Sequence, residues 1–374
     1  MNILMILANP FTFDARVYNE AKSLVDANHN VTILAWDKKG SFQRYDVKDG
    51  IKIIRSYNSN LMKMCPYDIF KLHLWWRKGY EDALNIINDN RIDVIHCHDF
   101  SSLPMGVRLK NKTKLPLIYD AHEIWGYMVE KDLPSIWAKY YIKKEEKLVK
   151  DTDHIITVAE PHRDWFRHMN HPHVSIVRNC KRIQNKNYNP PSNKHFTLLY
   201  IGGLSKIRFL LETIEVVNTL KNVSFKIAGY GDIEKEIIES VKYSNNGNIK
   251  YLGKIPMKKV VYETCLSDAV LCVFDPSYPN NQVGPPNKIF EAMVCGRPVI
   301  ATKGIYSGNL VEKLNMGITI NYNKKDLVKA IKLLRDNKEL REQLGKNAFK
   351  AALSKFNWKN QERRLLQIYK GINT

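Results

Sequence analysis

Long apolar runs are absent from this chain of 374 residues, and so are the paired cysteines that mark metal and disulfide sites. No hydrophobic stretch approaches the roughly 20 residues that a helix needs to span a bilayer. The six cysteines stand singly, without a CxxC pair: Cys65, Cys97, Cys180, Cys265, Cys272 and Cys295. This scatter argues against zinc and disulfides and favours reduced, core-filling thiols in a cytoplasmic protein.

Motifs for nucleic-acid binding are also missing, although the formal net charge is +20. The sequence has no RNP, helix-turn-helix or zinc-finger pattern, and its basic residues are not gathered into one tail. We therefore expect no nucleic acid as a partner. The charge is better matched to an anionic membrane surface, which would hold the protein peripherally on the cytosolic face.

Two stretches interleave aromatic and basic side chains, as interfacial helices do. The first holds Lys63, Tyr67, Phe70, Lys71, His73, Trp75, Trp76, Arg77, Lys78 and Tyr80, and the second Trp137, Lys139, Tyr140, Tyr141, Lys143, Lys144, Lys147 and Lys150. A core stripe of period near 3.6 explains part of the first stretch: Ile69, Leu72, Trp76, Tyr80, Ala83 and Ile87. Trp75, Arg77 and Lys78 lie off that stripe, so both interpretations can hold.

Strand and helix patterns alternate along the whole chain, which predicts parallel sheets covered on both faces. The apolar N-terminus lacks a basic n-region and is expected to be a strand, not a signal peptide. Strands are expected near 2–9, 31–36, 51–57, 93–98, 116–121, 154–159 and 174–178, and helices near 14–28, 67–89, 102–110, 134–150 and 161–169.

A polar stretch from Lys181 to His195 contains two prolines and is typical of a linker. The alternation restarts after it, so the chain is expected to form two α/β domains. Strands are predicted near 196–202, 223–228, 248–252, 269–274, 298–301 and 317–320, and helices near 206–220, 232–243, 256–266, 286–295 and 325–336. An amphipathic helix is expected to close the chain after residue 357.

The stretch from Gly284 to Ile300 predicts a rigid turn, a short helix, a glycine stop and a buried strand. Two prolines precede Asn287, and proline is tolerated in the first turn of a helix. Gly296 stands where a helix end requires positive φ. Lys288 lies in the first turn and Glu291 one turn later, so an anion site and a carboxylate share one helix.

This stretch resembles the donor-binding signature of GT-B glycosyltransferases, specifically the large retaining family 4, in a branch with a Pro-Asn-Lys-x-Phe-Glu variant. The resemblance implies a nucleotide-sugar donor, a UDP- or GDP-sugar, with Asn287 and Lys288 at the donor and Glu291 accepting hydrogen bonds from its ribose. Most relatives carry a second glutamate eight positions earlier, where this chain has Val283.

Three further loops are predicted to approach the donor. Gly202 and Gly203 allow close backbone approach before a helix that Ser205 could cap, and Arg208 stands where the family has a phosphate-binding lysine. Gly203 replaces the family's arginine. Gly229 is expected in a close turn at the same sheet edge. The loop that contains Ile255 is similar to the family loop whose backbone meets the base. The alternative is that Arg208 and Lys288 are solvated surface charges.

In the first half, His122 follows an apolar strand beside Asp120 and Glu123. The resemblance implies that His122 contacts the donor sugar, and in this type of transfer the leaving diphosphate takes the acceptor proton. His96 and His98 are predicted to alternate faces, so that they share no metal. The helix start from Asp14 to Ala21 also resembles this family branch, in which the preceding loop lies near the donor phosphate. The alternative is that Asp14 caps the helix and that Arg16 and Glu20 form an exposed pair.

The sequence therefore predicts a GT-B enzyme of two Rossmann-like doubly wound domains. The resemblance implies that residues 1–185 hold the acceptor and 186–355 the nucleotide-sugar, with residues 356–374 as a helix returning to the first domain. We expect retaining transfer to a lipid-linked or glycan acceptor, with no metal and no cofactor, since no DxD pair is evident. The alternative is a non-catalytic glycosyltransferase-like subunit that binds a nucleotide or a partner. A GT-B epimerase fits less well because its carboxylate set is missing.

Overall fold

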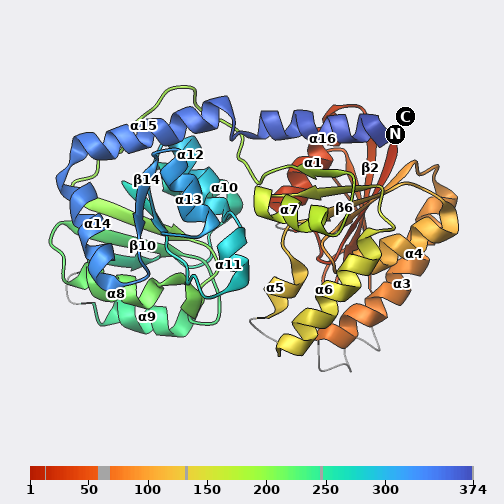
Figure 1. Cartoon of the computed structure of the whole chain (residues 1–374), viewed down its shortest axis with the longest axis horizontal. Helices are drawn as coiled ribbons and strands as arrows, with labels where there is room; N and C mark the ends of the chain where they lie inside the picture. The colour runs from red at the N-terminus through yellow and green to blue at the C-terminus, as the bar shows by residue number, and fades with distance from the viewer. Residues whose placement is uncertain (13, 58–67, 131–133, 245–246, 373–374) are drawn as a thin grey trace. The chain divides into compact units, whose positions relative to one another are not determined.

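In a computed structural model the chain forms two compact units, and the structure describes residues 1–12, 14–57, 68–130, 134–244 and 247–372, without the side chains of 68–70 (Figure 1). The first unit comprises Met1–Val177 and Glu362–Thr374, and the second Arg178–Gln361. These borders lie a few residues from those at 185 and 355 that the sequence suggested. No described helix is long and apolar enough to cross a membrane.

The first unit is built on an eight-stranded sheet in the order β3-β4-β2-β1-β5-β6-β7-β8, parallel except for the β3–β4 pair. Its strands are β1 (Asn2–Leu7), β2 (Asn30–Trp36), β3 (Tyr45–Lys48), β4 (Ile51–Ser56), β5 (Val94–His98), β6 (Leu117–Ala121), β7 (His154–Thr157) and β8 (Val174–Ile176). The central strands β5 and β6 are buried at every residue. Such strands belong to a parallel sheet covered on both faces.

Helices cover both faces of this sheet (Figure 1). They are α1 (Ala15–Asp26), α3 (Asp68–Asp89), α4 (Leu103–Thr113), α5 (Trp125–Val129), α6 (Ser135–Val149), α7 (Glu160–His168) and the part of α16 (Trp358–Ile372) that follows Gln361. Asp14 caps α1 as predicted, because its Oδ1 accepts a hydrogen bond from the Val17 backbone at 3.1 Å.

The second unit contains a six-stranded parallel sheet in the order β11-β10-β9-β12-β13-β14. Its strands are β9 (Phe196–Ile201), β10 (Val223–Ala228), β11 (Ile249–Tyr251), β12 (Ala269–Cys272), β13 (Val299–Thr302) and β14 (Gly317–Ile320). The helices are η1 (Lys206–Arg208), α8 (Leu210–Asn218), α9 (Glu234–Lys242), α10 (Met257–Cys265), α11 (Pro279–Val283), α12 (Asn287–Cys295), α13 (Tyr306–Lys313), α14 (Lys324–Asp336) and α15 (Lys338–Ser354). The order reverses beside β9, the switch point at which doubly wound sheets bind ligands.

The helix predicted over 206–220 is broken, which corrects that expectation. A 3₁₀ turn, Lys206–Arg208, is separated from α8 by Phe209, whose φ of 56° is left-handed. The Phe209 ring lies 4.5 Å from that of Tyr322, so tertiary packing holds the break. Ser205 precedes the turn but makes no side-chain capping hydrogen bond.

Several elements were not anticipated from the sequence. β3 is a short, fully exposed edge strand, and α15 buries the small residues Gly345, Ala348, Ala351 and Ala352 instead of a stripe of large apolar ones. The five cysteines among the described residues are free thiols, and Cys65 lies outside that part of the chain.

Candidate functional site

Helix α12 places a lysine in a protected position beside the end of β9. The helix starts after Pro286 and ends at Gly296, whose φ of 62° matches the predicted stop. Lys288 is only 7% exposed. Its Nζ lies 3.4 Å from the point where a Cβ on Gly202 would stand, so the glycine loop and the lysine meet. The alternative of a solvated surface charge is therefore wrong for Lys288.

Aromatic rings hold Lys288 and Arg208 close together. The Lys288 Nζ lies 4.4 Å from the Tyr200 ring centre and 4.7 Å from that of Phe274, and the Arg208 guanidinium lies 4.0 Å from the same Phe274 ring. Arg208 is half-buried and donates from Nη1 to Asn281 Oδ1 at 3.2 Å. Burial, together with the charge of Arg208, lowers the pKa of Lys288 to about 8.

Within the described residues, neither Lys288 nor Arg208 forms an ion pair with a carboxylate. A buried cation without a partner costs free energy, and two such cations on one ring also repel each other. A bound anion would remove both costs. The arrangement thus suits a ligand with more than one negative charge, and the arginine fork can bind phosphate oxygens in pairs.

Glu291, one turn after Lys288, has a partner that the sequence did not suggest. Its Oε1 lies 3.1 Å from Lys181 Nζ, and both side chains are largely buried. The alternative pairing with Lys288 is not formed. Lys181 is held in place through its backbone, which accepts a hydrogen bond from the Trp358 amide at 3.0 Å. Lys181 is the first residue of the stretch that was predicted to be a linker.

The glycines line up at the carboxyl ends of neighbouring strands. Gly202 and Gly229 follow β9 and β10 with φ of 149° and 140°. A Cβ on Gly229 would lie 1.8 Å from the Gly202 carbonyl oxygen, so this close approach needs glycine. Gly203 faces open space, whereas Ile255 is half-buried after β11.

Two more positions of the predicted donor motif lie at the start of α12 and at the end of α11. Asn287 is its exposed first residue. Val283 is the half-buried last residue of α11.

A second polar cluster, in the first unit, is centred on the buried carboxylate of Asp120. Arg16 donates to it from Nε at 2.8 Å and from Nη2 at 2.5 Å. The same Arg16 Nη2 lies 3.1 Å from Glu20 Oε1. The prediction of an exposed Arg16–Glu20 pair is wrong, because Arg16 and Glu20 are only 6% and 0% exposed. Their partner Asp120 is distant in sequence, so helical spacing alone could not indicate it.

His122 is held between two carboxylates at the end of β6. Its Nε2 lies 2.8 Å from Asp120 Oδ2, its Nδ1 lies 3.2 Å from Asp99 Oδ2, and its backbone N–H donates to Asp99 Oδ1. Burial would lower the pKa of His122, but Asp99 and Asp120 hold it well above its usual value. The ring is therefore an imidazolium at neutral pH. Asp99, on the neighbouring strand end, was not singled out from the sequence.

His96 and His98 lie on the same face of β5, which corrects the prediction that they alternate. Residues two apart in a strand point the same way, and these rings stack at 4.4 Å. With Glu20 and Asp120 they offer four ligand atoms within 4.8 Å of one another. The Arg16 guanidinium already binds both carboxylates there, so the chain itself supplies the cation that a metal ion would provide.

Two family models match the chain in succession. The model described as "Glycosyltransferase Family 4" matches residues 15–180, and the model "Glycosyl transferases group 1" matches residues 195–337. An uncharacterized glycosyltransferase of Methanocaldococcus jannaschii is 26% identical over 297 residues, which cover 79% of this chain and 80% of that protein.

Solved structures with the same architecture cover both units. Sucrose-phosphate synthase from Thermosynechococcus elongatus superposes with a TM-score of 0.82 at 15% identity, covering 100% of this chain and 99% of that one. Anabaena HepE in complex with UDP-glucose superposes with a TM-score of 0.74 at 15% identity, covering 99% of this chain and 100% of that one. At this level of identity the likeness shows the fold.

Proposed function

Because the chain belongs to the GT-B glycosyltransferases of group 1, we propose that it transfers a sugar from a nucleotide-sugar donor to a lipid-linked or glycan acceptor. The observation that carries this proposal is the pair of cations, Lys288 and Arg208, on the Phe274 ring without a carboxylate partner in the described chain. A nucleoside diphosphate supplies the missing negative charge.

The donor's diphosphate binds between the start of α12 and the glycine loop after β9. Lys288 and Arg208 neutralise it, and the unpaired N–H groups at the start of α12 add a favourable dipole. Gly202 and Gly229 let the backbone approach the ligand. Glu291, already oriented by Lys181, accepts hydrogen bonds from the ribose hydroxyls. UDP-glucose, which is bound in the HepE structure, is a nucleotide-sugar with such a diphosphate.

We infer a retaining, metal-independent reaction. Fixed positive charge at Lys288 and Arg208 stabilises the leaving diphosphate as the glycosidic bond breaks, which is the part a metal ion plays in other transferases. His122 is charged, with both ring nitrogens beside carboxylates, so it has no lone pair with which to take a proton. It therefore does not act as the general base, and we propose that the leaving diphosphate accepts the acceptor's proton.

A non-catalytic, glycosyltransferase-like binding subunit is the second candidate. It is favoured by Val283 and Gly203, which stand where the resemblance implies a sugar-binding glutamate and a phosphate-binding arginine. The enzyme requires a nucleotide site at α12, whereas such a subunit binds either a nucleotide or a protein partner. They differ in turnover, since only the enzyme releases a free nucleoside diphosphate when it meets donor and acceptor.

We also propose that an exposed surface of α6 contacts an anionic membrane. Ile136, Trp137 and Tyr140 are 72%, 48% and 48% exposed. Exposed lysines flank them on the same helix: Lys139, Lys143 and Lys147. Of the first aromatic–basic stretch, Lys63, Tyr67 and the side chains of Ile69 and Phe70 lie outside the described residues. Trp75 is fully buried against Trp36 and cannot contribute, contrary to the prediction.

A thermal-shift panel tests the nucleotide site. UDP, GDP, ADP and their common sugar conjugates are added to the wild type, to Lys288→Met and to the control Lys346→Met. Lys346 also lies over an aromatic ring, that of Tyr188, but is exposed on α15. We expect one nucleotide series to raise the Tm of the wild type and the control and not that of Lys288→Met. A panel without any shift in the wild type would contradict the proposal.

A further inference from the structure

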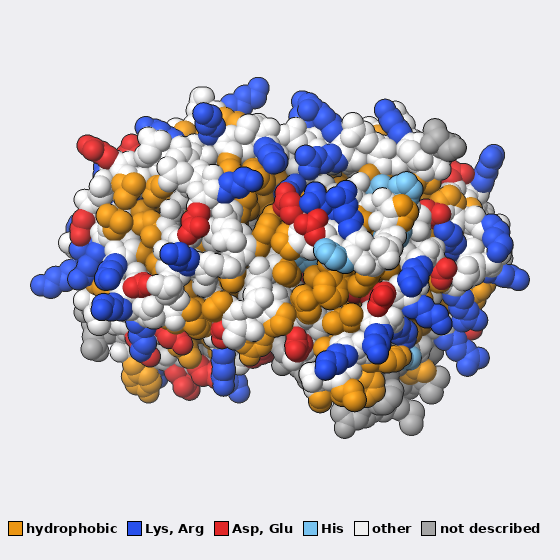
Figure 2. All heavy atoms as spheres, viewed as in Figure 1, with side chains coloured by type: hydrophobic (Ala, Val, Ile, Leu, Met, Phe, Trp, Pro, Cys, Tyr) orange, Lys and Arg blue, Asp and Glu red, His pale blue; other side chains and the backbone are white. Residues whose placement is uncertain are grey.

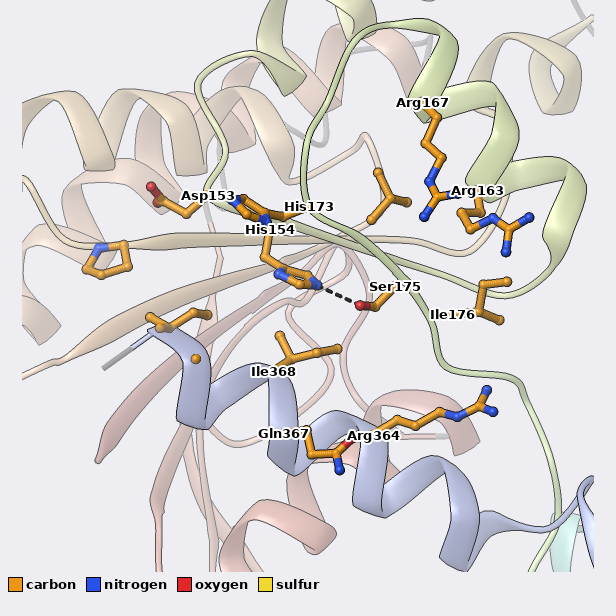
Figure 3. A pocket seen from close by; sticks show the side chains of 14 residues that line it. Asp153, His154, Arg163, Arg167, His173, Ser175, Ile176, Arg364, Gln367 and Ile368 are labelled. Carbon is orange, nitrogen blue, oxygen red and sulfur yellow. Dashed lines mark hydrogen bonds between the residues drawn. The ribbon is translucent and has the colours of Figure 1, made fainter. Parts of the chain in front are cut away.

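A cavity lies in the first unit, at the amino-terminal side of β6 and β7 and along the edge strand β8. Its volume is about 860 Å³, and its walls come from β7, α7, β8 and α16 (Figure 3). Pro116, which lines it, precedes β6, whereas His122 follows the same strand. The cavity and the His122 cluster are therefore at opposite ends of β6, about 20 Å apart by strand geometry.

Three arginines from two helices surround this cavity. Arg163 and Arg167 are one turn apart on α7, and Arg364 reaches it from α16 (Figure 3). Arg163 donates from Nε and Nη2 to Asp164 Oδ1 at 2.9 and 2.8 Å. Arg167 and the half-buried Arg364 have no ion pair within the described part of the chain. Two guanidinium groups without a counter-ion thus face one hollow.

The other walls contribute neutral donors and little negative charge. His154 and Ser175 form a hydrogen bond of 2.9 Å, and the His154 ring stacks on His173. Burial and the two neighbouring histidines lower the pKa of His154 to about 4, so its ring is neutral. Asp153 is the one acid among the described lining residues, and its charge is taken up by Lys110 at 2.6 Å.

We propose that this cavity binds a phosphate group, with Arg167 and Arg364 as its main partners. A guanidinium fork matches phosphate oxygens in geometry and charge, and two forks from different helices can bind one phosphate together. The volume admits more than a bare anion, so the ligand is a phosphate monoester or diester with a further substituent. The cavity shares no lining residue with the proposed donor site at α12, and this inference does not depend on the proposed transferase activity.

The test compares two charge reversals at adjacent positions of the intact protein. Arg364→Glu changes the cavity wall. Arg363→Glu changes the net charge equally at an exposed neighbour that does not line the cavity. Binding of inorganic phosphate is measured by titration calorimetry. Binding to vesicles of phosphatidylcholine with phosphatidic acid is measured by sedimentation. Arg167→Glu, at an exposed position, repeats the test in case Arg364→Glu is unstable.

We expect phosphate binding to weaken about tenfold or more in Arg364→Glu and Arg167→Glu, and to be retained in Arg363→Glu. If the cavity variants lose only vesicle binding, the phosphate belongs to a lipid headgroup. If they lose only the binding of inorganic phosphate, it belongs to a soluble ester. Equal binding by Arg363→Glu and the two cavity variants would overturn the proposal. So would a wild type that binds neither probe.

Discussion

At the scale of single residues, His122 shows how neighbouring carboxylates set the charge of a side chain. Its two ring nitrogens lie 3.2 and 2.8 Å from Asp99 and Asp120. We predict that NMR of the ring finds an imidazolium well above pH 6.5, and that Asp99→Asn lowers this pKa. A wild-type ring that titrates at or below the ordinary value of about 6.5 would contradict the assignment.

The raised pKa of His122 also determines how the free energy of unfolding changes with pH. The folded state holds the His122 proton more tightly than the unfolded state. The resulting contribution to the free energy of unfolding is complete below about pH 6.5 and is lost as the pH rises through the folded pKa. Chemical denaturation should show this loss reduced in Asp99→Asn relative to the wild type.

Some of these residues could be found from the sequence and others could not. His122, Lys288 and Glu291 stand next to local signals: a strand end, two prolines and a glycine stop. Lys181, Asp99 and Asn281 act through partners far along the chain, so no local pattern indicates them. Strand periodicity indicates that His96 and His98 lie on the same face, so the prediction that they alternate misapplied a signal that the sequence contains.

At the scale of elements, the loops after β9 and β10 depend on each other. We predict that Gly229→Ala lowers the free energy of unfolding by roughly 1–3 kcal/mol, because its Cβ would collide with the Gly202 carbonyl at positive φ. Gly203→Ala is the control, since a Cβ there meets nothing within 4 Å. Urea denaturation measures both, and equal stability of the two variants would refute the close packing.

The ion pair between Glu291 and Lys181 leads to a prediction about how the ribose of the nucleotide is recognised. If Glu291 accepts the ribose hydroxyls, removing the 2′- or 3′-hydroxyl should weaken binding to the wild type about tenfold. That penalty should shrink in Glu291→Gln. In Lys181→Met, the loss of the ion pair should lower stability but leave the hydroxyl preference. Calorimetry with deoxy nucleotides decides this, and an unchanged penalty in Glu291→Gln would remove Glu291 from the site.

Elements differ in how strongly the sequence determines them. α12 was predicted within a residue or two because proline and glycine mark both of its ends. The break at Phe209 was not predicted, since residues on either side keep a helical apolar spacing and the left-handed turn is held by Tyr322. Edge strand β3 has no buried face and hence no alternation to detect.

At the scale of the whole molecule, the chain carries a net charge of +20, and the Lys and Arg side chains on the face seen in Figure 2 are scattered, not gathered in one patch. We predict that the protein sediments with anionic vesicles at low salt and is released at high salt. Trp137→Ser and Tyr140→Ser together should weaken this binding, because they remove the exposed aromatic groups of α6. Failure of the wild type to sediment at low salt would refute membrane contact.

The central claim is that Lys288 and Arg208 hold a donor diphosphate. The most direct measurement is calorimetry of UDP and UMP, or of the corresponding pair for the base that the panel selects, with the wild type and Lys288→Met. We predict that the second phosphate improves wild-type binding about tenfold or more, and that Lys288→Met loses most of this gain. If the second phosphate improved the affinity of the wild type and of Lys288→Met equally, the diphosphate would bind elsewhere and the central claim would be wrong.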